Sequence, residues 1–158
     1  MNIPKNIMLK VTICALSCAL FLTSSNAQSD GMDKTDMSKA VPEGEFGELE
    51  WAPCPAPLDF EGCHITVLQG VPSKPNADIL FRMQPGTTAP EHWHTSAERM
   101  VLISGEMHVT YTGEETQVLK AGTYAYGPPQ KPHVAKCVGD EACVLFIAFE
   151  EPVDTFVK

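Results

Sequence analysis

Short apolar runs separated by glycine and proline divide the chain from Trp51 to Phe149, and this punctuation constrains its fold more than any other feature. Turn signals such as Pro85-Gly86 and Gly127-Pro128-Pro129 stand between runs rich in β-branched and aromatic residues. The runs lie at residues 65–68, 78–83, 99–104, 107–111, 118–119, 124–126, 133–137 and 143–149. Many short strands with turn signals between them are typical of an all-β sandwich or barrel. The 158 residues suit one such domain.

The N-terminal segment has the features of an export signal in the expected order. Lys5 and Lys10 give a positive start, residues 11–22 are apolar, and small residues precede Gln28. The apolar run is shorter than the ~20 residues that a membrane-spanning helix needs. A buried N-terminal helix and a lipoprotein signal at Cys18 are the alternatives.

These features predict how the chain is divided and where it resides. Residues 1–27 are predicted to be a secretory signal peptide, residues 28–45 a flexible polar leader and residues 46–158 the folded domain. We therefore predict a periplasmic or secreted protein with no stable membrane insertion. The formal net charge of −9, from 11 basic and 20 acidic residues, argues against nucleic acid as a partner, because nucleic acid requires a basic surface.

Four of the six cysteines follow the predicted signal peptide, an even number that suits disulfides in an oxidising compartment. Four cysteines allow three pairings. Cys137 and Cys143 flank a segment with the composition of a hairpin turn, so they can face each other, and Cys54 then pairs with Cys63 by elimination. The alternative is four small buried side chains that stay reduced. A zinc site is disfavoured because no Cys-x-x-Cys spacing occurs.

A group of histidines and one glutamate has the pattern of a metal site. Side chains of His92 and His94 point to the same face if both lie on a strand, so their imidazoles can converge on one ion. The small residues 95–97 allow the chain to turn and bring Glu98 to that ion. His133 follows a proline-rich turn and can come from a neighbouring strand. Three imidazoles and a carboxylate suit one divalent transition metal, namely Fe, Mn, Ni, Cu, Zn or Co.

The spacing around these residues resembles the two sequence motifs of the cupin superfamily. The first motif is matched throughout, with intervals of five, one, three and six residues between Gly86, His92, His94, Glu98 and Gly105. The second motif, Gly-x5-Pro-x-Gly-x2-His-x3-Asn, is matched at Gly122, Pro128 and His133. The chain departs from it where Gln130 replaces the glycine and Cys137 replaces the asparagine, and neither position is a metal ligand in the family pattern.

The resemblance implies a single-domain jelly-roll β-barrel that holds a metal through His92, His94, Glu98 and His133. It also implies a homodimer and a small-molecule substrate or ligand that enters the barrel mouth. Small cupins include dioxygenases, isomerases and lyases, so we predict an exported, metal-dependent, oxygenase-like enzyme. The alternatives are a metal-dependent isomerase or lyase, and a cupin that binds metal or a small molecule without catalysis.

Three residues are candidates for catalysis beyond metal binding. Glu98 can double as a proton acceptor. Arg82 can clamp a substrate carboxylate if its strand face points into the barrel, although an exposed residue or a structural ion pair is the alternative. Tyr126, or the nearby Tyr124, can line the pocket as a proton donor, although a tyrosine of the core or rim is the alternative.

Overall fold

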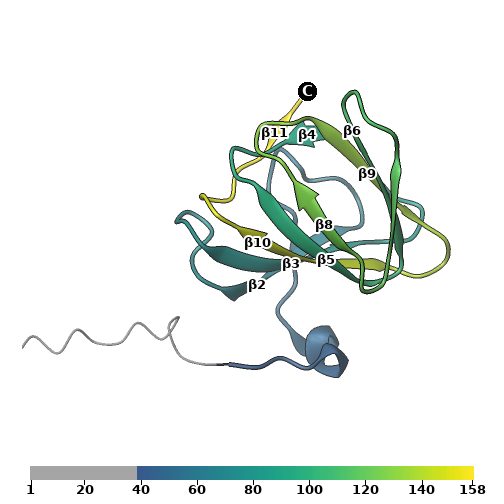
Figure 1. Ribbon diagram of the computed structural model, residues 1–158. Coiled ribbons are helices and arrows are strands. Elements are labelled where there is room, and N and C mark those ends of the chain that lie inside the picture. The colour runs from purple at the N-terminus through teal and green to yellow at the C-terminus, as the bar shows by residue number, and fades with distance from the viewer. Residues whose placement is uncertain (1–38) are drawn as a thin grey trace, which may run out of the picture. The chain divides into compact units, whose positions relative to one another are not determined.

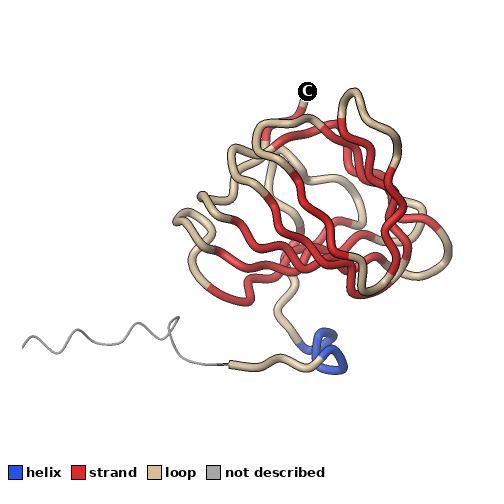
Figure 2. The backbone as a smooth tube through the Cα atoms, in the orientation of Figure 1, coloured by secondary structure: helices blue, strands red, loops and turns tan. Residues whose placement is uncertain are grey.

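The computed structural model describes residues 39–158 (Figure 1). The predicted signal peptide and residues 28–38 of the predicted leader lie outside the described residues. The described part is built almost wholly of antiparallel strands, which confirms the all-β prediction (Figure 2). Within residues 39–158 the only helix is the short 3-10 helix η2 (Glu43–Glu48), which begins inside the predicted leader. None of the helices in this part of the chain has the length and apolar character to cross a membrane.

The strands form two sheets. Across the six-stranded sheet the order is β1 (Ala52–Pro53), β2 (Cys63–Gln69), β3 (Ala77–Met83), β10 (Cys143–Phe149), β5 (Glu98–Ser104) and β8 (Tyr124–Gly127). Across the five-stranded sheet it is β11 (Phe156–Val157), β4 (Thr88–Trp93), β9 (His133–Val138), β6 (Glu106–Tyr111) and β7 (Gln117–Lys120). From β3 to β6 the chain changes sheet at every connection, and it does so again from β7 to β10. This alternation gives the jelly roll visible in Figure 1.

The hydrophobic core lies between the two sheets because alternate side chains of each strand point inward. On β10 the buried residues are Cys143, Leu145, Ile147 and Phe149, while the residues between them are partly exposed. Facing strands supply further buried side chains, among them Ile79, Phe81, Met107 and Val109. Burial of each large apolar side chain contributes about 1.5–3 kcal/mol to stability. All seven residues of β10 are apolar, so the packing of the two sheets, and not the sequence pattern, selects which face of this strand forms the core.

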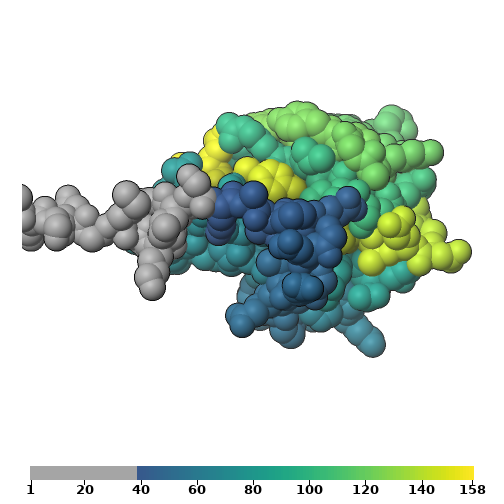
Figure 3. Space-filling model, turned by 90° about the horizontal axis from the view of Figure 1, so that it is seen from below, coloured from purple at the N-terminus to yellow at the C-terminus, as the bar shows by residue number. Residues whose placement is uncertain are grey.

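The outer face of the six-stranded sheet is also partly covered. Lys39, Val41 and Phe46 line a hollow together with outward side chains of the sheet, among them Leu80 and Phe146 (Figure 3). The indole nitrogen of Trp51 donates a hydrogen bond of 2.8 Å to the carbonyl of Phe46. Part of the segment that the sequence predicted to be a leader thus packs against the domain.

Both predicted disulfides are present. Cys54 is bonded to Cys63, with the two Cα atoms 5.4 Å apart, and Cys137 is bonded to Cys143, with the Cα atoms 5.7 Å apart. The first closes the loop before β2, and the second joins the end of β9 to the start of β10. Two disulfides suit an oxidising compartment outside the cytoplasm.

Candidate metal centre

The four predicted ligands meet inside the barrel, although they come from three strands. His92 lies near the end of β4, His94 just beyond it, Glu98 at the start of β5 and His133 at the start of β9. His92 and His133 are paired across β4 and β9, and their ring centroids are 4.2 Å apart. All four residues are buried, with at most 7% of their surface exposed. A histidine 35 positions beyond Glu98 therefore reaches the same point because β9 lies beside β4.

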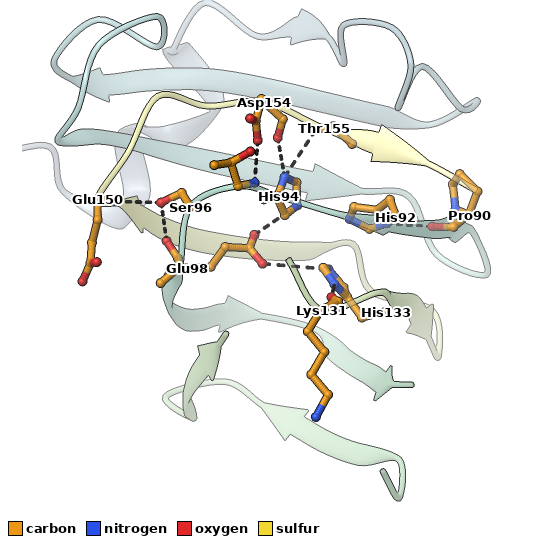
Figure 4. Close-up of polar contacts among 12 residues, drawn as sticks. Pro90, His92, His94, Ser96, Glu98, Lys131, His133, Glu150, Asp154 and Thr155 are labelled. Carbon is orange, nitrogen blue, oxygen red and sulfur yellow. Dashed lines mark hydrogen bonds and ion pairs between the residues drawn. The ribbon is translucent and has the colours of Figure 1, made fainter. Parts of the chain in front are cut away.

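Glu98 stands between two of the histidines (Figure 4). Its carboxylate oxygens lie 3.5 Å from Nε2 of His94 and 3.8 Å from Nε2 of His133. One ring nitrogen from each of His92, His94 and His133 lies within 4.8 Å of the others. The site thus combines three imidazoles and one carboxylate around one small volume, a donor set that suits a transition metal.

The second ring nitrogen of each histidine is occupied by the main chain. Nδ1 of His92 lies 2.7 Å from the carbonyl of Pro90, and Nδ1 of His133 lies 3.2 Å from the carbonyl of Lys131. Nδ1 of His94 lies 2.5 Å from the carbonyl of Asp154. A carbonyl oxygen only accepts, so Nδ1 carries the proton and donates in all three rings. Each Nε2 is then left unprotonated, as metal ligation requires, and the residues present therefore fit a metal ion.

Burial favours the neutral form of His92 and His133. Desolvation lowers the pKa of His92 to about 3, and the neighbouring His133 acts in the same direction. Burial also lowers the pKa of His133, against the opposing effect of the Glu98 carboxylate. A neutral imidazole can bind a metal whereas an imidazolium cannot, so the site is prepared for a metal at neutral pH.

We expect the metal-free protein to lose stability as the pH falls below 6.5. The native pKa of His92 is about 3, whereas an unfolded histidine has a pKa of about 6.5, so the unfolded chain takes up the proton first. The free energy of unfolding should then decrease by about 1.4 kcal/mol per pH unit from His92 alone. Urea unfolding of the metal-free protein between pH 4.5 and pH 7.5 measures this slope. In His92→Gln, which has no titratable group at this position, the free energy of unfolding should depend less steeply on pH. An unchanged slope would contradict the assignment of this pH dependence to His92.

The C-terminal segment holds the turn that carries His94. The buried hydroxyl of Ser96 accepts hydrogen bonds of 2.9 and 3.0 Å from the main-chain N–H groups of Glu150 and Glu151 (Figure 4). The N–H of Thr95 donates to the carboxylate of Asp154 at 2.8 Å, and the Asp154 carbonyl accepts from His94. Ser96 and Asp154 therefore orient a metal ligand through contacts that span more than 50 residues of sequence.

Gln130 replaces the glycine of the second motif and keeps the backbone conformation that a glycine allows. Its φ angle is 58°, in the left-handed region that side chains other than glycine rarely adopt. Its N–H donates a hydrogen bond of 2.7 Å to the carbonyl of His94. The turn before His133 is thereby attached to the end of β4, and the departure from the motif leaves the ligand in place.

A cavity of about 80 Å³ adjoins the four ligands. Its walls are mostly aliphatic and aromatic side chains from both sheets, among them Leu58, Ile79, Phe81 and Leu145. A mostly apolar cavity with a few polar groups at one place is typical of a small-molecule site.

Tyr111 and Thr155 are polar residues of this cavity that the sequence analysis did not select, and Tyr111 is the more deeply buried of the two. Tyr111 lies opposite His133 across β6 and β9, its ring centroid is 4.8 Å from that of His133, and it is 5% exposed. Its hydroxyl is buried and has no hydrogen-bond partner within the described residues. Burial, followed by the charges of Glu98 and Glu114, raises the pKa of its phenol, so the group is a neutral donor. The alternation of Met107, Val109 and Tyr111 was the available signal, because it puts the tyrosine on the core face.

Gly127 leaves room for this tyrosine. A Cβ atom at Gly127 would stand 2.5 Å from Oη of Tyr111 and 2.9 Å from Oε2 of Glu98. Both oxygens therefore border the same small space beside the ligands. The absence of a side chain at Gly127 allows the hydroxyl and the carboxylate to approach each other.

Arg82 and Tyr126 lie away from the cavity. The guanidinium of Arg82 stacks over the ring of Trp51, 4.2 Å from its centroid, on the face of β3 opposite to Ile79 and Phe81. The side chain of Tyr126 is 52% exposed, and Tyr124 is exposed as well. The structure therefore brings together His92, His94, Glu98 and His133, and it does not bring Arg82 or Tyr126 to them.

Comparison with known proteins gives one family and several similar folds. The family model described as the Cupin domain matches residues 79–149. No curated protein matches the sequence. Among solved structures, the DMSP lyase DddQ from Ruegeria pomeroyi DSS-3 superposes with a TM-score of 0.60 at 17% identity, over 71% of this chain and 62% of that one.

Two further structures extend this likeness. Oxalate decarboxylase from Bacillus subtilis has a TM-score of 0.51 at 24% identity, over 60% of this chain and 27% of that one. KdgF from Halomonas sp. has a TM-score of 0.54 at 16% identity, over 69% of this chain and 93% of that one. The chain thus spans less than two thirds of the lyase and about a quarter of the decarboxylase, and at these identities the likeness shows a shared fold.

Proposed function

We propose, from the match of residues 79–149 to the Cupin domain and from the buried ligand set, that the chain is a metal-dependent enzyme of the cupin superfamily acting on a small organic molecule. One observation carries the proposal. Three histidines donate their Nδ1 protons to main-chain carbonyls and direct unprotonated Nε2 atoms, together with Glu98, toward one place in the barrel.

The adjoining cavity favours catalysis over simple metal binding. A metal carrier has no need of an apolar cavity beside its ligands, whereas an enzyme needs space for a substrate. When bound, the metal supplies a Lewis acid and a template that orients the substrate. The aliphatic walls exclude water from the reacting groups, and Glu98 and the Tyr111 hydroxyl offer a proton acceptor and a proton donor beside them.

Two classes of reaction fit this arrangement. Oxygenase-like chemistry is the first candidate, because three imidazoles and a carboxylate suit redox-active metals and leave coordination positions open to ligands. A lyase or isomerase is the second, because the unpartnered hydroxyl of Tyr111 beside Glu98 provides the groups that proton transfer requires. The similar structures include a lyase and a decarboxylase, which is compatible with the second candidate.

We further propose that the protein is exported to the periplasm or secreted and acts as a homodimer. The two disulfides support the location, because thiols in the cytoplasm are kept reduced.

Elemental analysis combined with dioxygen uptake tests the proposed function. The mature protein purified from its native compartment should contain about one equivalent of a transition metal. Dioxygen consumption would then be recorded on the same sample with a panel of phenols, thiols and keto acids. Metal with substrate-dependent uptake would support an oxygenase, and metal with product formed in the absence of uptake would support a lyase or isomerase. Metal without any turnover would favour the non-catalytic alternative, and absence of metal would refute the proposal.

A further inference from the structure

The charge of the cavity wall restricts what can bind there. Among its described lining residues, the only ionisable side chains are His92, His94, Glu98, His133 and Tyr111, and there is neither lysine nor arginine. A bound metal ion would therefore be the one cationic partner that this cavity offers, and it would lie at the end formed by the three histidines and Glu98. A negative group of a ligand beside the metal would be balanced, and a second negative group farther along the wall would have no partner.

A second charge on the ligand would be costly inside this cavity. An ionised carboxylate that is moved from water into an apolar environment without a partner loses several kcal/mol of hydration free energy. Away from the ligands the wall consists of side chains such as Leu58, Ile79, Phe81 and Leu145, none of which can donate a hydrogen bond. The wall therefore selects against a polar group at the end of the ligand that is remote from the metal.

Two hydroxyls, those of Tyr111 and Thr155, line the cavity near the metal centre, and the Thr155 hydroxyl lies 3.4 Å from Nδ1 of His94. The hydroxyl of Tyr111 is buried, has no partner within the described residues, and borders the same space as the Glu98 carboxylate beside Gly127. A buried hydroxyl without a partner forfeits a hydrogen bond that it would make in water. A ligand whose oxygen atom lies between the metal and this hydroxyl would recover that interaction.

We propose, on the basis of the proposed function, that the ligand is a small molecule with an apolar body and a single oxygen-bearing head of at most one negative charge, and that Tyr111 donates a hydrogen bond to this head. Monocarboxylates, phenols and enols belong to this class, whereas dicarboxylates do not. Tyr111 is then a specificity-determining residue, and its part in binding does not depend on which reaction follows.

Matched pairs of carboxylates test the substrate class. Hexanoate and adipate have six carbons each and differ by the second carboxylate, and butanoate and succinate repeat the comparison at four carbons. The protein would be loaded with Co²⁺, whose visible spectrum changes when a ligand enters its coordination sphere, and titrated with each acid at pH 7. We expect each monocarboxylate to bind at least ten-fold more tightly than its dicarboxylate counterpart. Equal or tighter binding of the dicarboxylates, or no binding of the monocarboxylates, would overturn the proposal.

Two tyrosine variants test the role of Tyr111. Tyr111→Phe removes only the hydroxyl and should weaken hexanoate binding about 5- to 10-fold, the effect of one lost hydrogen bond. Tyr126→Phe is the matched control, because Tyr126 is exposed, and it should bind hexanoate as the unsubstituted protein does. Equal affinities in the two variants would remove Tyr111 from the proposal.

The outcomes separate this inference from the proposed function. Failure to bind Co²⁺ in a 1:1 ratio would refute the metal site itself, and the ligand class would fall with it. Stoichiometric Co²⁺ binding combined with a preference for adipate or succinate would leave the metal site in place and refute only the ligand class.

Discussion

His94→Ala is expected to abolish stoichiometric metal binding and to reduce any metal-dependent turnover by at least 100-fold. The substitution removes one of three imidazoles, and nothing in the described structure can replace it, because His92 and His133 already face the same place. Loss of groups that merely orient a ligand commonly costs 10- to 100-fold in metal affinity, so loss of a ligand should cost more. Metal content after dialysis, measured by elemental analysis, decides the outcome.

The matched control for this experiment is His108→Ala. His108 lies on β6 of the same barrel, but its Nε2 contacts Glu106 at 2.9 Å and it does not line the cavity. The same substitution there should leave about one equivalent of metal bound. If both variants are folded and His94→Ala still binds about one equivalent of metal, the proposed metal site is refuted.

Removal of both disulfides is expected to cost about 5 kcal/mol of stability. The bonds join cysteines 9 and 6 positions apart, and closing loops of this size restricts the unfolded chain by about 2–3 kcal/mol each. Cys63 and Cys143 both pair with Met83 from opposite sides, so the two bonds lie about 10 Å apart and their effects should nearly add. A loss of this size is comparable to the whole stability of many domains.

Urea unfolding of three variants measures this effect. The pair Cys54→Ser and Cys63→Ser, the pair Cys137→Ser and Cys143→Ser, and the combination of all four would be compared with the unsubstituted protein. The variant that lacks Cys137 and Cys143 should still bind its metal. Cys143 lies at the start of β10, whereas Phe149, the residue that pairs with Glu98, lies at the other end of this strand. Four free thiols in the natural protein, or unfolding free energies that match across the variants, would contradict the prediction.

Much of the fold follows from local sequence. The runs at residues 99–104 and 143–149 correspond to β5 and β10 with at most one residue of difference, because short continuous apolar runs bounded by turn signals are typical of buried strands. β1 and β11 were not predicted, since two residues are too few to show any period. The 3-10 helix η2 was not predicted either, because its six residues are too short to show a helical period, and the carbonyl of Phe46 within it accepts a hydrogen bond from Trp51.

Three of the four candidate metal ligands could be predicted because their spacing is a local property, whereas His133 was predicted from the second motif. His92 and His94 share a face through the strand period, and the motif places Glu98 after a short turn. The orientation of these ligands, by contrast, depends on contacts between residues that are far apart in the sequence. The groups that hold His94 include Ser96 and the Asp154 carbonyl, and the latter is 60 residues away in sequence. No local pattern indicates such a contact.

The sequence by itself determined the all-β class, the four candidate ligands and a disulfide pairing that the structure confirms. Only the tertiary structure decided which polar side chains face the cavity. Arg82 alternates with Phe81 in the sequence, but the choice of inner face depends on how the two sheets pack, and that packing turns Arg82 toward Trp51. Tyr111 faces the ligands because β6 pairs with β9 in the register that sets it opposite His133, and pairing between distant strands is a property of the whole barrel.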